Sequence, residues 1–528
     1  ENTYQNGELV KKIEYYPTGK KSKEATYSDK GESEMYSLYD ENENKYFEGK
    51  YKKNELKSAI QITKNPPKPT PININKKPVQ FKNFNGDVII SGEFEKGQKN
   101  NVWEQRYSNG IVKFKETYKK GVQEGLAHNY NRDGSLNSIT NYANNKISGL
   151  YEGFDFGVQD ESTYFDNGEK NGPFKTFFAD GSTESEGFYT NDELIGEKIE
   201  YWMNGKLKSK TDYVEDEVTS FKRFDTNGEP VSSVDYKNRS GNFTINLYNG
   251  TVIENYDMVN GYFNGKYIEK DKDNSLIVDG EFVNGMRNNY INFYGPAGKL
   301  SHERPMYCGK LHGLQKQYDL AGNLRIADEY IFGNEYGKTT RYFHNKAKVY
   351  EYTQLDNLLE GDYTYYNQKG EALLIVGYQN NAAKYYIRKG KDGQLNDKVE
   401  IINETGEISS FYPNGKLAAT LTLDKGNWEG KFIINNVEGK PEIVTDYKKN
   451  FAEGERLEYY PNGKVYKVER LKAGDFDGLQ EYFAENGNRI ISANYKNNNL
   501  HGDVIIYKDN KPVVTKKYDT NELVQIIK

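Results

Sequence analysis

The chain of 528 residues carries 72 basic and 78 acidic side chains, a formal net charge of -6, and a single cysteine. The charges show no lysine and arginine stripe of the kind that phosphate backbones select, so nucleic acid is not expected as a partner. One cysteine excludes a disulfide framework and a cysteine-based zinc site, and no run of about 18 apolar residues is present to span a bilayer.

The chain begins at Glu1 rather than at a methionine. A cleaved signal peptide is one expectation, and an artificial boundary or a start further upstream would give the same sequence. A lipid anchor on a residue before Glu1 would be invisible here. Low mean hydropathy (-0.94) would favour disorder, but 46 Tyr and 25 Phe supply apolar surface whose polar edges can stay in water. We therefore expect a thin fold with a shallow core.

Two kinds of turn signal alternate along the chain. The first is an aromatic residue followed by a Gly-containing turn, and such turns favour Asn and Gly because they need positive φ. It recurs at Tyr15-Tyr16-Pro17-Thr18-Gly19-Lys20, Tyr107-Ser108-Asn109-Gly110, Tyr201-Trp202-Met203-Asn204-Gly205-Lys206, Phe411-Tyr412-Pro413-Asn414-Gly415-Lys416 and Tyr459-Tyr460-Pro461-Asn462-Gly463-Lys464. The second is an aromatic residue with Gly about seven positions on, as at Tyr118 with Gly125, Tyr142 with Gly149, Tyr189 with Gly196, Tyr330 with Gly337, Tyr447 with Gly454 and Tyr495 with Gly502.

These signals repeat every 23 to 24 residues, as the regular series Gly430, Gly454, Gly478 and Gly502 illustrates. About twenty-one such units fill the chain, each with two turns and two short strands of roughly alternating polarity. Helix signals are nearly absent. Because single hairpins are unstable in water, each must stack on its neighbours. The sequence predicts an all-β, elongated solenoid of stacked antiparallel β-hairpins that forms a curved or twisted ribbon.

One segment interrupts the repeats. Residues 1–60 are expected to form an N-terminal pair of repeats, residues 61–80, with Pro66, Pro67, Pro69 and Pro71, a Pro-rich extended linker, and residues 81–528 the main repeat array. Irregular units, where we expect kinks or partner contacts, lie near Phe154, Lys270, Arg388 and Asn435.

The unit Tyr-Tyr-Pro-Asn-Gly-Lys, a polar strand, Tyr-Lys-Asn or Tyr-Lys-Lys and a following Gly resembles the bacterial MORN-repeat variant, often labelled the YwqK-type antitoxin family. The best matches run from Tyr459 to Gly478, Phe411 to Gly430 and Tyr482 to Gly502, while Phe343-His344-Asn345-Lys346 lacks the turn glycine. The resemblance implies a hairpin stack used for protein association and sometimes for membrane attachment.

No catalytic, cofactor-binding or metal-binding residue is expected, and the sequence singles out no partner-binding residue. Cys308 precedes His312 by four positions, but the Cys308 slot matches Lys448 and the His312 slot matches His501, so both read as repeat positions rather than a nucleophile and base. The other histidines are His128, His302 and His344.

Two acidic clusters invite a calcium interpretation. Asp271-Lys272-Asp273-Asn274 lacks the Gly and terminal Glu of an EF-hand loop, and Asp155 with Asp160-Glu161 is equally incomplete. We expect solvated turns at both. Aromatic cages for glycans or quaternary amines usually pair Trp residues, but Trp103, Trp202 and Trp428 lie far apart in sequence, so the rings are expected to stack between hairpins.

These observations predict a non-enzymatic scaffold without cofactors. Its expected partners are proteins of a bacterial cell envelope, and its expected location is the periplasm or the outer-membrane surface after export. Two alternatives stay open: a protein that binds a glycan or lipid surface, and an antitoxin-like cytoplasmic neutraliser of a partner toxin.

Overall fold

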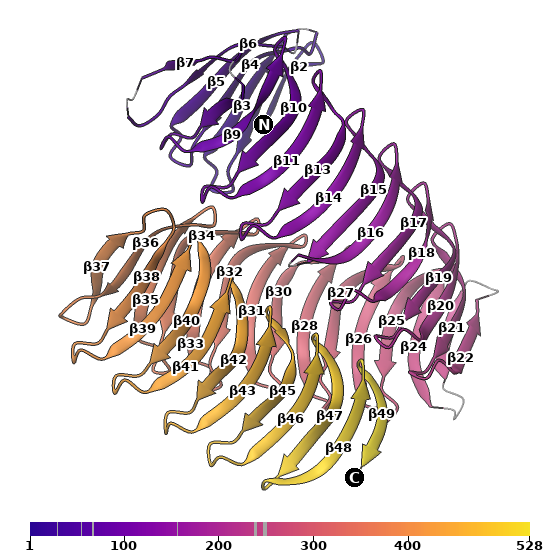
Figure 1. Cartoon of the computed structure of the whole chain (residues 1–528). Coiled ribbons are helices and arrows are strands. Elements are labelled where there is room, and N and C mark those ends of the chain that lie inside the picture. Colours follow the sequence, from indigo (N-terminus) through magenta and orange to yellow (C-terminus); the bar gives the residue numbers. More distant parts are fainter. Residues whose placement is uncertain are drawn as a thin grey trace. The chain divides into compact units, whose positions relative to one another are not determined.

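A computed structural model describes residues 1–28, 30–53, 55–65, 68–75, 77–155, 157–236, 240–246 and 251–527. Within these residues every regular element is a β-strand, and the neighbouring strands of each sheet pair antiparallel (Figure 1). The predicted all-β class of stacked hairpins is therefore confirmed. In the part of the chain that the structure describes, no helix is long and apolar enough to cross a membrane.

The strands form four sheets in which spatial order follows chain order. The first sheet contains β1 (Asn2–Gln5), β2 (Glu8–Tyr15), β3 (Lys21–Tyr27), β4 (Ser33–Tyr39), β5 (Lys45–Lys52), β6 (Glu55–Gln61) and β7 (Thr70–Ile72). The second contains β8 (Val79–Lys82), β9 (Val88–Glu95), β10 (Gln98–Arg106), β11 (Val112–Lys119), β12 (Val122–Gln123), β13 (Gly125–Tyr130), β14 (Leu136–Ala143), β15 (Lys146–Asp155), β16 (Val158–Asp166), β17 (Glu169–Phe177), β18 (Thr183–Thr190), β19 (Glu193–Tyr201), β20 (Leu207–Val214), β21 (Glu217–Phe224) and β22 (Pro230–Asp235).

The third sheet contains β23 (Gly241–Asn246), β24 (Val252–Val259), β25 (Tyr262–Lys270), β26 (Leu276–Val283), β27 (Met286–Tyr294), β28 (Leu300–Tyr307), β29 (Lys310–Leu311), β30 (Gly313–Tyr318), β31 (Leu324–Ile331), β32 (Asn334–Tyr342), β33 (Lys348–Leu355), β34 (Leu358–Tyr366), β35 (Ala372–Gln379), β36 (Ala382–Lys389) and β37 (Leu395–Glu400). The fourth contains β38 (Gly406–Phe411), β39 (Leu417–Asp424), β40 (Asn427–Asn435), β41 (Pro441–Lys448), β42 (Phe451–Tyr459), β43 (Val465–Lys472), β44 (Asp475–Phe476), β45 (Gly478–Phe483), β46 (Arg489–Lys496), β47 (Asn499–Lys508), β48 (Lys511–Asp519) and β49 (Glu522–Ile527).

The chain divides into two compact units, residues 1–174 and 175–528. The sequence instead predicts domain boundaries on both sides of the Pro-rich segment 61–80, and that division stays a prediction. Within this segment the structure places β7 and the start of β8, while Pro66 and Pro67 lie outside the described residues.

The aromatic turn signal has the same physical role in successive repeats. Its ring reaches across to the next hairpin and donates a hydrogen bond to the backbone carbonyl 23 residues further on. Tyr107 Oη donates to Tyr130 O at 2.9 Å, and Tyr412 Oη donates to Asn435 O at 2.8 Å. Trp202 fills the same slot and donates from Nε1 to Asp225 O at 2.9 Å. At these positions the aromatic side chains link successive hairpins by hydrogen bonds, and the predicted stacking of rings stays a prediction there.

The turn that lacks glycine yields a stability prediction. Lys346 takes the slot of Gly415 and adopts a left-handed backbone, with φ of 67° against 78° for the glycine. A side chain in this region strains the backbone, so Lys346→Gly is expected to raise the free energy of unfolding by about 1 kcal/mol. The reverse change, Gly415→Lys, should lower it by a similar amount. Urea unfolding curves of both variants check this, and a destabilised Lys346→Gly would contradict it.

Within the second unit, the fourth sheet runs back along the third. The tight turns between paired strands of the third sheet contact the fourth sheet. The order of these contacts is reversed, so turns earlier in the third sheet contact residues later in the fourth sheet. Figure 1 shows β38–β49 alongside the strands of the third sheet. The contacts are Asn367 with Tyr412 (3.1 Å), Gln368 with Glu442 (2.8 Å), His344 with Glu458 (2.9 Å), Asp319 with Tyr466 (2.5 Å) and Asp271 with Tyr518 (3.2 Å).

The space between these two sheets has an apolar part and a charged part. The apolar part joins rings and aliphatic side chains of both sheets, among them Tyr365, Leu374 and Ile434, which are fully buried. The charged part centres on Glu469, whose side chain is 0% exposed. Its carboxylate pairs with Lys467 (3.2 Å), Arg456 (3.3 Å) and Arg325 (3.7 Å). We call these four side chains the buried ionic cluster.

Candidate functional site

Cys308 and His312 lie at an exposed hairpin end of the second unit. Cys308 has a left-handed backbone (φ 47°), and its N–H donates to Asn288 Oδ1 at 3.4 Å. The His312 ring packs on Phe332 and on Tyr307, with centroids 4.9 and 5.8 Å away. The histidine is therefore engaged by surface rings, and its repeat counterpart His501 is likewise exposed, 3.3 Å from Asp519.

The other histidines lie in three different environments. His128 stacks on Tyr130, with 6.4 Å between ring centroids. His344 contacts Glu458 through both its backbone N–H and its Nδ1. His302 lines a cavity between the third and fourth sheets. Within the described ranges no group of three or more His, Cys, Asp and Glu side chains is arranged to hold a metal ion.

The prediction of a solvated turn is wrong for Asp271, because the fourth sheet covers it. Asp271 is 8% exposed and accepts a hydrogen bond from Tyr518, and Lys516 pairs with Asp273 at 2.7 Å. This turn follows Lys270, near which the sequence predicts an irregular unit with a kink or a partner contact. These contacts of the turn are with the fourth sheet of the same chain. Asp155 and Asp160 of the other cluster are exposed, as predicted.

The covered carboxyl predicts a pH dependence of stability. Burial, with Glu522 and Asp273 nearby, raises the pKa of Asp271 to about 6. Because the folded state binds this proton more tightly than the unfolded chain, wild-type stability falls as pH rises from about 4 to about 6. Asp271→Asn should remove that loss. The unfolding free energy of the variant minus that of wild type should therefore be roughly 2 to 3 kcal/mol larger at pH 8 than at pH 4. Equal differences in unfolding free energy at the two pH values would contradict it.

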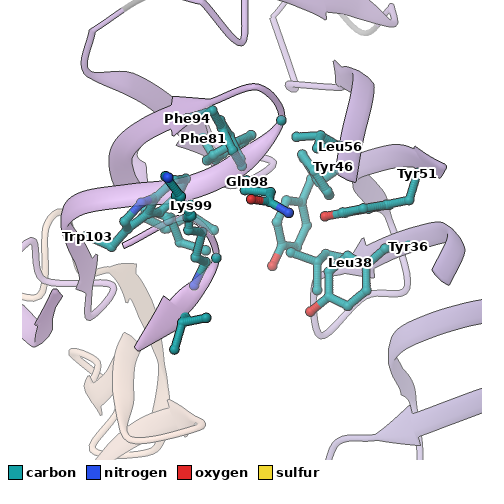
Figure 2. A pocket seen from close by; sticks show the side chains of 17 residues that line it. Tyr36, Leu38, Tyr46, Tyr51, Leu56, Phe81, Phe94, Gln98, Lys99 and Trp103 are labelled. Atoms are coloured by element: carbon teal, nitrogen blue, oxygen red, sulfur yellow. The ribbon is translucent and has the colours of Figure 1, made fainter. Parts of the chain in front are cut away.

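The first unit contains an aromatic pocket. It has a volume of about 430 Å³, within the range of ligand pockets. Figure 2 shows Tyr36, Tyr46 and Tyr51 on one side, and Phe81 and Trp103 on the other. The remaining walls come from Leu38, Phe47, Leu56, Ile89, Ile90, Phe94 and Val122. We call this site the aromatic pocket.

Strand alternation accounts for Tyr36 and Tyr51 in the pocket, but not for Tyr46, which directly precedes Phe47 on β5. Tyr36 and Leu38 lie two apart on β4, and Phe47 and Tyr51 lie four apart on β5, so each pair shares one face. Gly49 sits between the latter two, and a Cβ there would lie 3.1 to 3.2 Å from both rings. The glycine thus leaves the rings room to converge.

The second sheet supplies the opposite wall. Trp103 is 4% exposed, lies flat over Gly92, and donates from Nε1 to Glu93 O at 3.1 Å. Its ring packs edge to face on Phe94, with centroids 4.9 Å apart. Both wall rings are therefore held by packing before any ligand arrives.

Direct contacts join the two walls. The ring of Phe47 in the first sheet meets Phe81 in the second edge to face, with centroids 5.1 Å apart. Leu56 N donates to Gly97 O at 2.8 Å, which ties the β9–β10 turn to the start of β6. The pocket thus exists only because segments before and after the Pro-rich region pack together.

Polar groups line the edge of the pocket. Lys99 lies over the rings of Tyr118 (4.4 Å) and Trp103 (5.1 Å), and burial lowers the pKa of its amine. Burial raises the pKa of Tyr36 and of Tyr51 to about 12, so both hydroxyls are neutral donors at physiological pH. The pocket can hold an apolar group and offer hydrogen bonds at its margin.

Sequence reasoning noticed Trp103 but not the tyrosines that face it. The available signal was the density of rings in β4 and β5, where Tyr36, Tyr46, Phe47 and Tyr51 fall within sixteen residues. That density alone does not distinguish a ring ladder from a pocket wall.

Comparison with known proteins finds the MORN repeat variant at residues 404–425, 452–471 and 476–497. No curated protein is similar to the chain. Solved structures that match include the TcdB2-TccC3-Cdc42 complex (12% identity, 96% of this chain and 29% of that chain, TM-score 0.14) and TcdB2-TccC3 (11%, 98% and 32%, TM-score 0.15). A third is the Photorhabdus luminescens Tc holotoxin pore (10%, 99% and 31%, TM-score 0.14). The chain spans less than a third of each of these chains, and three segments of its C-terminal part match the MORN repeat variant.

Proposed function

We propose that this protein is a non-enzymatic repeat scaffold that binds a partner protein through the aromatic pocket of its first unit. The observation that carries the proposal is the pocket itself, a cavity walled by rings that packing already holds in place. Aromatic pockets of this kind accept the apolar anchor residues that dominate protein interfaces.

The pocket margin defines the chemistry of the partner. Lys99 and the exposed Lys120 lie at the pocket, and Gln98 is between its two walls. An acidic residue next to the anchor would meet these amines, and charged groups at a rim chiefly set specificity and association rate. We therefore propose a partner segment with one large apolar side chain flanked by Asp or Glu.

The proposal extends to location. The partner would be a protein of a bacterial cell envelope, and this chain would reach it by export to the periplasm or to the outer membrane. Fractionation of the native cells, with detection of the tagged full chain, tests this part separately from the pocket. Recovery in the cytoplasmic fraction would contradict export and favour the alternative role as a neutraliser of a toxin.

The pocket is tested by blocking it. Leu38→Trp places a bulky ring inside the pocket, while Leu150→Trp adds the same ring at a position of the first unit that is 46% exposed. Affinity purification from native cells should recover a stoichiometric partner with wild type and Leu150→Trp and lose it with Leu38→Trp. Circular dichroism of both variants shows whether the fold is retained.

Two outcomes would overturn the proposal. Recovery of the same partner with well-folded Leu38→Trp would place binding elsewhere on the chain. Recovery of no protein partner would favour a glycan, since sugar rings also stack on aromatic faces, and binding of purified envelope polysaccharide that Leu38→Trp abolishes would then establish that alternative.

A further inference from the structure

A second cavity lies inside the second unit, between the third and fourth sheets. Its volume is about 600 Å³, and its lining comes from β26–β31 on one side and from β43–β47 on the other. It is separate from the aromatic pocket, shares no residue with it, and plays no part in the proposed function.

Three nitrogen-bearing side chains gather on the wall formed by the third sheet. His302 and Arg304 lie two apart on β28, so they share a face, and Arg325 lies on β31. The Nε atoms of both arginines are buried and have no hydrogen-bond partner. Burial, together with the two arginines, lowers the pKa of His302 to about 4, so its ring is neutral at pH 7.

The acidic side chains around the cavity, Asp475 of its lining included, have partners within the chain. Asp319 accepts the hydroxyl of Tyr466 at 2.5 Å, and Asp328 accepts Gln315 at 3.1 Å and Tyr330 at 3.3 Å. Glu469 belongs to the buried ionic cluster, in which Arg325 is its most distant partner, at 3.7 Å.

Arg304 has no carboxylate of its own. No ion pair of the described residues includes it, and its guanidinium lies 5.0 Å from the centre of the Phe293 ring. Arg304 is half-buried and is attracted to Asp328 without pairing with it, so this wall can attract a further negative charge.

The rest of the lining is apolar and aromatic. Phe293, Tyr294, Phe476 and Tyr495 contribute rings, and Leu471 contributes an aliphatic surface. A bare inorganic anion would leave this apolar surface uncovered, while a neutral apolar molecule would make no use of the positive charge of the two arginines. The lining matches a molecule that has both an anionic group and an apolar body.

We propose that this cavity binds a small organic anion whose carboxylate or phosphate group lies between Arg304 and Arg325 and whose ring or short aliphatic body packs on Phe293 and Phe476. Each guanidinium would attract the anionic group from the cavity wall and donate a charge-assisted hydrogen bond to it. The ligand would also bridge the two sheets and hold them together.

A pair of dyes separates the charged part of the ligand from the apolar part. Anilinonaphthalene sulfonate carries aromatic rings and one negative charge, and N-phenyl-1-naphthylamine carries the same rings without the charge. With the full chain, the anionic dye should bind at least about tenfold more tightly than the neutral one, since only the anionic dye can accept hydrogen bonds from the charged arginines. Hydrogen exchange should slow in β28 and β31 when the anionic dye is bound, whether or not the dye also slows exchange in β9 and β10 of the aromatic pocket.

Substitution assigns the effect to the arginine. Arg304→Gln should weaken the anionic dye at least about tenfold and leave the neutral dye unchanged. It should also raise the thermal midpoint of the ligand-free protein, because it removes a charge that has no partner. The matched control Arg489→Gln changes a 46% exposed arginine that pairs with Glu481 at 2.8 Å, and dye binding should not change.

Several results would overturn the proposal. These are equal affinity for the two dyes in wild type, protection confined to β9 and β10, or anionic-dye affinity unchanged in Arg304→Gln. The first two measurements need no variant, so they decide the matter even if Arg304→Gln does not fold.

Discussion

Replacing Glu469 by Gln is expected to lower the free energy of unfolding of the second unit by about 3 to 5 kcal/mol. The carboxylate is fully buried in the ionic cluster, where it faces Arg325, Arg456 and Lys467 and accepts the hydroxyl of Tyr482 at 2.6 Å. Gln would keep the shape of the side chain. It would remove the negative charge that balances Arg325, Arg456 and Lys467. Uncompensated buried charge accounts for the size of the loss.

The loss should depend on pH in a defined direction. Burial opposes ionisation of Glu469, but Arg325, Lys467 and Arg456 outweigh it and hold its pKa well below the usual range. A lowered folded-state pKa contributes stability that is present above the unfolded pKa, near 4, and is lost as pH falls through the folded pKa. The difference between wild type and Glu469→Gln should therefore be largest at neutral pH and shrink in acid.

The measurement combines urea unfolding with hydrogen exchange, so that the change can be located in β42, β43 and β45. Glu455→Gln is the matched control, because Glu455 is 53% exposed and pairs with Arg470 at the surface of the same sheet. That pair should contribute less than about 1 kcal/mol. If the two variants unfold within that margin of each other, the buried cluster does not hold the sheets together.

The repeating hairpins could be predicted from the sequence because each depends on a few neighbouring residues. A left-handed residue ends one strand and starts the next, so Gly415 and Gly463 mark turns without knowledge of the rest of the chain. The hydrogen bond from Tyr412 to the carbonyl of Asn435 likewise needs only the repeat length. Spacing in the sequence carries that information directly.

The return of the fourth sheet along the third could not be predicted in this way. Its contacts join residues far apart in the chain, such as Asp271 with Tyr518, and the residues that make them occupy ordinary turn slots. Lys467 and Glu469 alternate with Val468 along β43, a pattern that usually places the apolar residue inward. Here the two charged residues are 2% and 0% exposed. The buried Glu469 pairs with Arg325 of the third sheet, and the periodicity of β43 alone does not predict that partner.

The aromatic pocket was hidden for a different reason. Its two walls lie on either side of residues 61–80, and the sequence interpreted that stretch as a spacer. Phe47 and Phe81 meet across it, although nothing in either strand specifies the other as a partner. The wall around Trp103 does have a local signal in the sequence, because the ring packs on Gly92, where a side chain would collide with it. This contact can be tested.

Trp103→Ala is expected to lower the free energy of unfolding of the first unit by about 3 to 5 kcal/mol, because it removes a buried ring and leaves a cavity. Gly92→Ala should lower it by about 1 to 3 kcal/mol. A Cβ at Gly92 would lie 2.2 Å from the Trp103 ring, so the ring would have to move. Gly92 is in a strand and has no positive φ, so the ring is the main obstacle to the methyl group.

The double variant separates this contact from every other effect of the two changes. In the Trp103→Ala background the methyl group that Gly92→Ala introduces has room, so the second change should be nearly neutral there, which gives a coupling of about 2 kcal/mol. Gly406→Ala is the control, because a Cβ there meets nothing within 4 Å, and it should change stability by less than about 1 kcal/mol. If Gly92→Ala has the same effect with and without Trp103, the ring does not rest on the glycine. The wall of the aromatic pocket, and with it the proposed anchor site, would then be wrongly placed.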